Sequence, residues 1–345
     1  MVIKTDLSKT NTPRVRGVRG HRWFWGRLLL LSLTFGILLP LRVFAQGPTT
    51  IRYGKVSKSG LYWAHYVAET KGFFRDEQIH EETVLTRSSS LGVQVLIAGS
   101  VDIVGVDSAP AILSAEKGSD VALIAGVINK PTYSVVVRPD IKSIEDLRGK
   151  TLGVSNVKTG EVVFLKKVLN KYGLRDGDYV LSNAGGAAER FAAMQKGVMA
   201  GTVLPSPFDF RLQDLGLRIL LATSQVVRDY QFLVEAARRS WAKANEATLI
   251  RYLRVLRHSY LWMNDPANRD EASAILGKEL NLDIRYAQRS YDTWVGREGA
   301  YSPEISHAGL QPVLEYLAEI GELKPPLPPP EKYLDPVYLE RARSR

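Results

Sequence analysis

Five short polar or glycine-rich loops, each ahead of a predicted helix, are the segments of this chain best suited to chemistry. They lie at residues 57–60, 87–90, 107–108, 155–160 and 185–186. The first N–H groups of a helix lack partners within it and lie at the positive end of its dipole, so several such ends together can hold an anionic or polar group. The residues expected to contact a ligand are Ser57, Lys58, Ser59, Gly60, Arg87, Ser88, Ser89, Asp107, Ser108, Tyr133, Ser155, Thr159, Gly160 and Gly186.

Two charged residues in these loops make opposite predictions about the ligand. The guanidinium of Arg87 suits a carboxylate, sulfonate or phosphate, so Arg87 is the expected counter-ion. The carboxylate of Asp107 could repel an anion or pair with a ligand amine. Tyr133, with Tyr62 and Trp63, could stack on a flat ligand. The alternative for each single loop is ordinary helix capping, and the recurrence of such loops in both halves favours binding.

Catalysis is not indicated by the residue types. The chain contains no cysteine, which excludes disulfides, thiolate metal sites and thiol catalysis. No nucleophile–base pair or metal-ligand spacing stands out, and His65 lies inside a predicted helix, where a lone histidine is usually structural. We therefore expect no enzyme activity, no catalytic residue, no metal site and no cofactor.

The elements that position the loops alternate between short β-branched runs and helical segments, which predicts an α/β fold with mainly parallel sheets. In such sheets ligands bind beyond the carboxyl ends of the strands, where these loops fall. A second series of strands and helices begins at residue 151, and helical periodicity dominates from residue 245. This order predicts two lobes with a cleft between them, followed by C-terminal helices.

The N-terminal segment has the features of a secretory signal. Residues 1–27 carry seven bases and one acid, residues 28–39 are uncharged and apolar, and Val43-Phe44-Ala45 predicts cleavage after Ala45. The apolar run is shorter than the roughly 20 residues of a membrane span. An uncleaved membrane tether is the alternative, and both readings place the remaining chain outside the cytoplasm, in the periplasm.

The positive net charge does not indicate nucleic-acid binding. Of 46 Lys and Arg residues, eight lie in residues 1–45 with one of the 36 acids, which leaves 38 bases, 35 acids and a net charge of +3. No basic cluster with interleaved aromatic residues occurs in the remainder. Nucleic acid is therefore excluded as the expected partner.

Four segments resemble solute-binding proteins of the nitrate/sulfonate/taurine type. They are residues 57–74 (SKSGLYWAHYVAETKGFF), 96–111 (LIAGSVDIVGVDSAPA), 143–160 (SIEDLRGKTLGVSNVKTG) and 194–207 (MQKGVMAGTVLPSP), and LRGKTLGV is the most specific stretch. The resemblance runs from about residue 50 to about residue 265. It implies a type II periplasmic-binding fold with two crossovers between the lobes, placed near Val137 and Val226.

The domain prediction combines this resemblance with the signal. Residues 1–45 are the signal, 46–330 the solute-binding domain and 331–345 a C-terminal tail. Within the domain, residues 50–137 and 226–330 form the first lobe and residues 138–225 the second.

The implied function is capture of a small anionic or polar ligand between the lobes for an ABC importer. The expected partners are a membrane permease and an ATPase, and we expect a monomer. A sensory receptor with the same fold is an alternative that the sequence does not separate from transport. Another is a pyrimidine synthase of the same family, which gives up its own histidine and uses a cysteine-rich iron-binding motif. This chain has no cysteine, and Lys58-Ser59 stands where that enzyme has a histidine.

Overall fold

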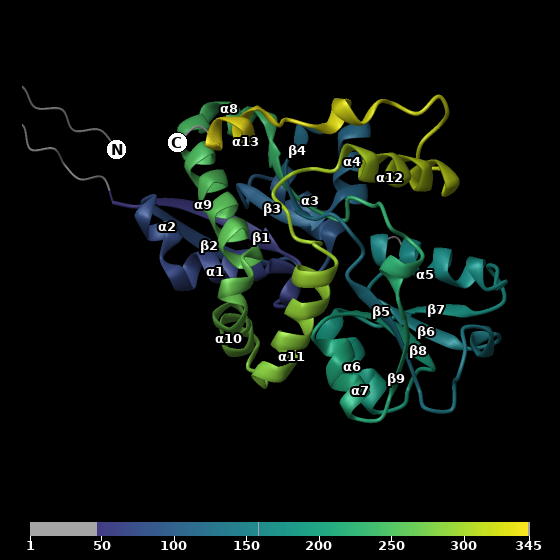
Figure 1. The fold of residues 1–345 in the computed structure, drawn as a ribbon. Coiled ribbons are helices and arrows are strands. Elements are labelled where there is room, and N and C mark those ends of the chain that lie inside the picture. Colours follow the sequence, from purple (N-terminus) through teal and green to yellow (C-terminus); the bar gives the residue numbers. More distant parts are fainter. Residues whose placement is uncertain (1–46, 158, 344–345) are drawn as a thin grey trace, which may run out of the picture. The chain divides into compact units, whose positions relative to one another are not determined.

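Two five-stranded sheets carry the fold of this chain (Figure 1). The computed structural model describes residues 47–157 and 159–343, so the predicted signal at residues 1–45 lies outside the described residues. No helix in the described part has both the length and the apolar character that a membrane crossing requires.

The first sheet has the strand order β2-β1-β3-β10-β4. Its strands are β1 (Thr49–Lys55), β2 (Ile79–Leu85), β3 (Ile103–Asp107), β4 (Val121–Ile128) and β10 (Leu233–Arg238). Strand β1 pairs in parallel with β2 and β3, whereas β10 pairs antiparallel with both β3 and β4. β3 and β4 are buried along their whole length and, apart from Asp107 at the end of β3, consist of apolar residues and glycine.

The second sheet repeats this plan with the order β7-β6-β8-β5-β9. Its strands are β5 (Tyr133–Val137), β6 (Thr151–Val154), β7 (Val180–Asn183), β8 (Gly201–Pro205) and β9 (Arg218–Ala222). Strand β5 runs antiparallel to its neighbours β8 and β9, while β6 is parallel to β7 and β8. Each described sheet thus has one strand running against four others, and the predicted mixed, mainly parallel α/β class is confirmed.

Helices connect the strands and then continue beyond the last one (Figure 1). The α-helices are α1 (Trp63–Lys71), α2 (Phe73–Asp76), α3 (Ser89–Ile97), α4 (Ser108–Glu116), α5 (Gly160–Lys171), α6 (Ala187–Gln195), α7 (Phe208–Asp214), α8 (Arg239–Ala244), α9 (Glu246–Asn264), α10 (Arg269–Leu280), α11 (Ile284–Ser290), α12 (His307–Glu319) and α13 (Val337–Ala342). Shorter turns are η1 (Gly60–Tyr62), η2 (Glu145–Leu147), η3 (Thr223–Gln225), η4 (Pro266–Asn268), η6 (Pro330–Tyr333) and the π-helical η5 (Tyr291–Arg297).

The predicted first lobe boundary at residue 137 is wrong by one strand. β5 belongs to the second sheet, so the chain leaves the first sheet in residues 129–132, directly after β4. It returns between β9 and β10, in residues 223–232. Both β4 and β5 are wholly buried and, apart from Ser134, largely apolar, and periodicity gives no signal for the sheet that such a strand joins.

Residues 331–343, predicted as a C-terminal tail, pack against β4 and α9. Leu334 forms an isolated bridge with Leu123 of β4, and the Asp335 N–H donates to the Leu123 carbonyl at 2.9 Å. Helix α13 then packs against α9, burying Tyr338 and Leu339. This segment therefore covers the first sheet beside β4, and it extends the domain beyond residue 330.

A buried histidine between two carboxylates lies in the core of the first sheet. His65 Nδ1 is 2.9 Å from Glu81 Oε2, and its Nε2 is 3.1 Å from Glu235 Oε1. Its ring stacks on Tyr53 at a centroid distance of 4.3 Å. Burial alone would lower the pKa of His65, but Glu81 and Glu235 outweigh it and raise that pKa to about 9. His65 lies inside helix α1, as predicted, and both of its ring nitrogens are occupied by carboxylates.

We expect the protein to lose stability as the pH rises from about 6.5 to 9. Protonated His65 is favoured in the folded state, so its contribution is complete below the unfolded pKa near 6.5 and disappears through the folded pKa of about 9. The shift corresponds to roughly 3 kcal/mol. Urea unfolding across this range measures the slope, and His65→Gln should flatten it. An equally steep slope in that variant would contradict this role.

Candidate functional site

The polar loops predicted from the first half of the chain meet at the carboxyl ends of β1, β2 and β3. Ser57 Oγ donates to Ser59 Oγ at 3.0 Å in the loop after β1. The Asp107 N–H donates to Ser89 Oγ at 3.1 Å, which joins the ends of the loops after β2 and β3. Ser108 Oγ donates to the Gln231 carbonyl at 2.5 Å and is buried. Ser89 and Ser108 thus hold backbone segments in place, whereas the Ser57–Ser59 bond stays within one loop.

The loop after β1 approaches the second sheet at Gly60. A Cβ at this position would lie 2.9 Å from the carbonyl oxygen of Ser206, just after β8, so only glycine fits without displacement. The Gly60 carbonyl accepts a hydrogen bond from the Tyr301 hydroxyl at 2.8 Å. Lys58 binds Glu279 of α10 at 3.1 Å and is exposed, so its charge is directed to the protein surface.

Asp107 joins the first sheet to the start of α5. The Gly160 N–H donates to Asp107 Oδ2 at 2.6 Å, and the Ala109 N–H donates to Oδ1 at 3.0 Å. A Cβ at residue 160 would lie only 2.0 Å from Oδ2. The side chain caps α4 and binds the first N–H of α5 at the same time. Two predicted site residues, 53 positions apart in sequence, are therefore in direct contact.

A buried ion pair lies beside this contact. Arg190 Nη2 donates to Glu161 Oε2 at 2.9 Å, and Arg190 Nη1 donates to the Gly185 carbonyl at 2.8 Å. The other oxygen of Glu161 accepts the N–H of Ser155. The pair thereby ties the start of α5 to the two loops that follow β6 and β7.

The other predicted site residues of the second half make hydrogen bonds within their own loops or with the helix that follows. Thr159 Oγ1 donates to the Asn156 carbonyl at 2.7 Å and lies 3.4 Å from Ser155 Oγ. Gly186 precedes α6, and no side chain caps that helix. No hydrogen bond within the described structure joins Gly186 to Asp107 or Gly160; its carbonyl accepts the Arg190 N–H at 3.0 Å.

Burial raises the pKa of Asp107 to about 7, and Glu161 adds to the rise. The two N–H donors oppose it, because they stabilise the charged carboxylate. The side chain is only 2% exposed. Asp107 consequently changes charge near neutral pH, which a surface aspartate does not do.

Aromatic side chains enclose the same region. Tyr133, at the start of β5, has its pKa raised by burial, with Glu161, Arg190 and Asp107 all near enough to affect it. Phe164 of α5 packs edge-on against Tyr230 at 4.8 Å and against Phe232 at 5.3 Å. The Tyr230 hydroxyl is buried and has no hydrogen-bond partner within the described residues.

Arg87 is exposed in the loop after β2 and has an unusual backbone conformation. Its φ of 63° lies in the left-handed region, which side chains other than glycine, asparagine and aspartate rarely adopt. Its guanidinium makes no hydrogen bond or ion pair with the described residues. Strained residues of this kind concentrate at functional sites, which supports the predicted binding role of Arg87.

The capping alternative is realised at three helices. Ser88 Oγ accepts the Leu91 N–H at the start of α3, and Asp107 serves both α4 and α5. The protein thus satisfies several of the N–H groups that the sequence suggested for an anion. The starts of η1 and α6 have no side-chain cap.

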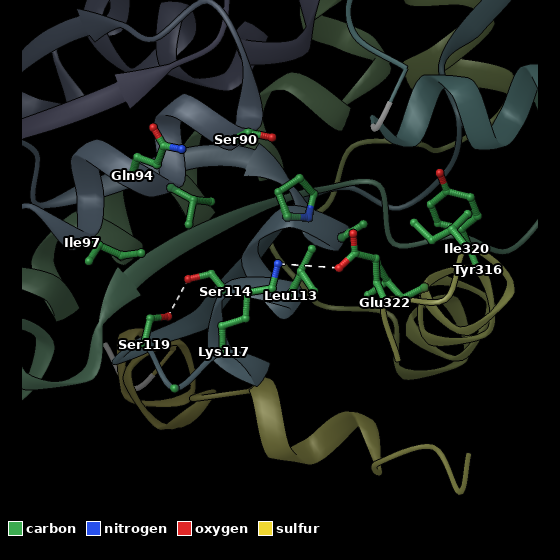
Figure 2. Close-up of a pocket in the computed structure, with 15 residues that line it drawn as sticks. Ser90, Gln94, Ile97, Leu113, Ser114, Lys117, Ser119, Tyr316, Ile320 and Glu322 are labelled. Atoms are coloured by element: carbon green, nitrogen blue, oxygen red, sulfur yellow. Dashed lines mark hydrogen bonds and ion pairs between the residues drawn. The ribbon is translucent and has the colours of Figure 1, made fainter. Parts of the chain in front are cut away.

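A separate groove of about 640 Å³ lies between α3, α4 and α12 (Figure 2). It is lined by apolar residues such as Leu113 and Ile320 and by polar groups that satisfy one another: Lys117 pairs with Glu322 at 3.6 Å, and Ser114 with Ser119 at 2.5 Å. None of the predicted ligand residues lines it. The polar loops are the better candidate site, because Asp107 at the end of β3 binds the start of α5 there. The buried Tyr230 hydroxyl near Asp107, on the segment between β9 and β10, also lacks a partner within the described residues.

The described residues contain no cluster of three or more His, Cys, Asp or Glu side chains arranged to hold a metal ion. Sequence reasoning missed Glu161, Arg190, Tyr230 and Trp294, whose indole N–H donates to Ser206 Oγ at 2.7 Å. Glu161 follows Gly160 directly and could have been noticed as an acid in the first helical turn. The others carry no local signal.

Solved structures with the same architecture support the fold. The alkanesulfonate-binding protein SsuA from Xanthomonas axonopodis pv. citri, bound to MOPS, aligns with a TM-score of 0.69 at 17% identity, over 84% of this chain and 99% of that one. The periplasmic nitrate-binding protein NrtA from Synechocystis PCC 6803 aligns with a TM-score of 0.69 at 15% identity, over 83% of this chain and 84% of that one. The predicted periplasmic-binding fold is confirmed.

Sequence comparison gives the family. The chain is similar to YtlA of Bacillus subtilis (strain 168), a protein named for a proposed role as a binding protein. The two sequences are 23% identical over 266 aligned residues, which cover 74% of this chain and 78% of YtlA. The family model described as "NMT1/THI5 like" matches residues 62–269, more than half of the chain. The chain belongs to the NMT1/THI5-like family.

Proposed function

We propose that this protein is the solute-binding component of an ABC importer and captures a small polar ligand where the loops of the two sheets meet. The observation that carries the proposal is the hydrogen bond between Asp107, at the end of β3, and Gly160, at the start of α5. A ligand held at this point would touch both sheets. Its contacts would then favour the closed arrangement over an open one, as in hinge-type receptors.

The two sheets with their helices are the proposed lobes, connected by residues 129–132 and 223–232. The names of similar structures support a transport role, since they include an alkanesulfonate-binding protein, a nitrate-binding protein and the ligand-binding component of an ABC-type import system from Staphylococcus aureus. The proposed partners are a permease and an ATPase. A monomer in the periplasm, exported by residues 1–45, completes the proposal.

A thermal-shift screen of polar metabolites tests this function. A ligand at 100 times its dissociation constant should add about 2.7 kcal/mol to the free energy of unfolding. The predicted contact between Arg87 and the ligand is tested with Arg87→Gly, because glycine accepts the left-handed backbone of this position and leaves the fold intact. We expect this variant to lose at least tenfold in affinity for the ligand found. Unchanged affinity would remove Arg87 from the site, and a screen without any stabilising compound would contradict the proposed function.

A further inference from the structure

The start of α5 already holds an anion, and that anion is the protein's own. Asp107 Oδ2 accepts the first N–H of the helix at 2.6 Å, the position that an anionic ligand group would take. Residue 160 has no side chain to separate them. An anionic ligand binding here must displace a carboxylate that is held on a second N–H, from Ala109, at 3.0 Å.

The charges beside this helix start also disfavour an added anion. Asp107 and Glu161 are both buried there, and Glu161 raises the pKa of Asp107, as like charges do. The neighbouring cation, Arg190, is 2% exposed and directs its two terminal nitrogens to Glu161 and to the Gly185 carbonyl. Its Nε–H is buried and has no partner within the described residues, so Nε is the one nitrogen of this group that is left for a ligand. The three groups together have a formal charge of −1 when Asp107 is ionised.

The surroundings of Asp107 contain phenol groups and aromatic rings. The Tyr230 hydroxyl is fully buried without a partner within the described residues, and Asp107 is near enough to raise its pKa. Asp107 similarly affects Tyr133. Aromatic rings attract cations electrostatically, and the effect grows when water is excluded. A carboxylate, phenol oxygens and aromatic rings form the surroundings that a cationic nitrogen prefers.

We propose that the ligand carries a protonated nitrogen, as an organic ammonium or amidinium group, which donates to the Asp107 carboxylate. This inference rests on the proposed solute-binding function and narrows its ligand class. Each carboxylate oxygen can accept two hydrogen bonds, and each has one from the backbone, so Asp107 can bind the ligand and keep its contact with Gly160. Asp107 selects the cationic nitrogen and disfavours an anionic group at the start of α5, while Arg87 contacts another polar group of the same ligand.

The inference predicts a pH dependence with a definite sign. Asp107 loses its charge as the pH falls through its pKa of about 7, so a cation should bind more weakly at pH 6 than at pH 8. The charged groups facing it are Glu161 and Arg190, which bind each other. Burial raises the pKa of Tyr133, Tyr230 and Tyr316, so these phenols stay neutral across this range. Asp107 is therefore the group expected to titrate.

Matched probes test the ligand class. Each set presents one scaffold with three heads: phenethylammonium, 2-phenylethanol and phenylacetate, and then butylammonium, 1-butanol and butyrate. We expect the ammonium members to raise the melting temperature of the protein at pH 8 and the carboxylates to have no effect. Asp107→Asn should weaken ammonium binding at least tenfold, and so should lowering the pH of the wild-type protein to 6. Asp102→Asn, one residue before the start of β3 and at the other end of the strand from Asp107, is the control and should keep the response.

Three results with these probes would overturn the inference: stabilisation by the carboxylates in preference to the ammonium compounds, no response to either ammonium compound, or ammonium affinity that is the same in Asp107→Asn. The pH comparison on the wild-type protein stands even if that variant does not fold. Failure of the proposed function looks different, because then no compound in the wider metabolite screen stabilises the protein. A stabilising compound from that screen that has no cationic nitrogen would contradict the proposed ligand class and leave the proposed binding function in place.

Discussion

Gly160→Ala should reduce the free energy of unfolding by about 2–4 kcal/mol at pH 8 and weaken ligand binding at least tenfold. The new Cβ would lie 2.0 Å from Asp107 Oδ2 and 2.8 Å from Cγ, far inside contact distance. The carboxylate or α5 must move, and the Gly160–Asp107 hydrogen bond is lost. Hydrogen bonds to charged groups contribute about 1.5–3 kcal/mol, and the buried carboxylate is left with one donor. Urea unfolding measures the loss.

The collision identifies the cause of this effect. Asp107→Ala removes the atoms that meet the new methyl group, so the double variant should be more stable than the sum of the two single changes predicts, by at least about 1 kcal/mol. Gly296→Ala is the matched control, because a Cβ there meets its nearest neighbour, the Tyr291 carbonyl oxygen, at an ordinary 3.6 Å. Additive single effects, or a loss in Gly296→Ala as large as in Gly160→Ala, would show that the contact with Asp107 does not cause the instability.

Gly160 also illustrates how far sequence reasoning reaches. The helix beginning near residue 160 and the need for close backbone approach were both predictable, because glycine in a polar loop ahead of a helical pattern is a local signal. The predicted partner was a ligand. The structure brings a carboxylate from 53 residues earlier to the same N–H, and no local pattern encodes that meeting.

The strands show the same division between local and long-range information. Alternation of β-branched runs and helices predicted the α/β class, since each element is marked by its own periodicity. β5 was assigned to the wrong lobe, and β10, which returns the chain to the first sheet between β3 and β4, was not predicted. Both are antiparallel insertions in their sheets. Their positions depend on pairing with distant strands, which the sequence of a single segment does not reveal.

The buried pair Glu161–Arg190 is the clearest case of a site feature without a sequence signal. Its residues lie 29 positions apart on α5 and α6, and an arginine in an amphipathic helix ordinarily indicates a solvated face. Here the guanidinium is buried, because the start of α5 presents a carboxylate to it. Arg190 holds Glu161 beside Asp107 and supplies the positive charge without which these two carboxylates would give the site a net charge of −2.

Arg190→Met should therefore destabilise the protein by about 3–5 kcal/mol, since it leaves the Glu161 carboxylate buried without its cation. Urea unfolding at pH 8 measures the change. The control is the ion pair between Lys166, also on α5, and Asp176, whose charged atoms lie 2.7 Å apart. Asp176 is 71% exposed, so Asp176→Asn should lower the free energy of unfolding by no more than about 1 kcal/mol. Adding Glu161→Leu to Arg190→Met removes the stranded charge and should restore part of the stability. If Arg190→Met costs as little as Asp176→Asn, then water reaches Glu161 and the start of α5 is not the enclosed, low-dielectric place where one aspartate could discriminate between ligands of opposite charge.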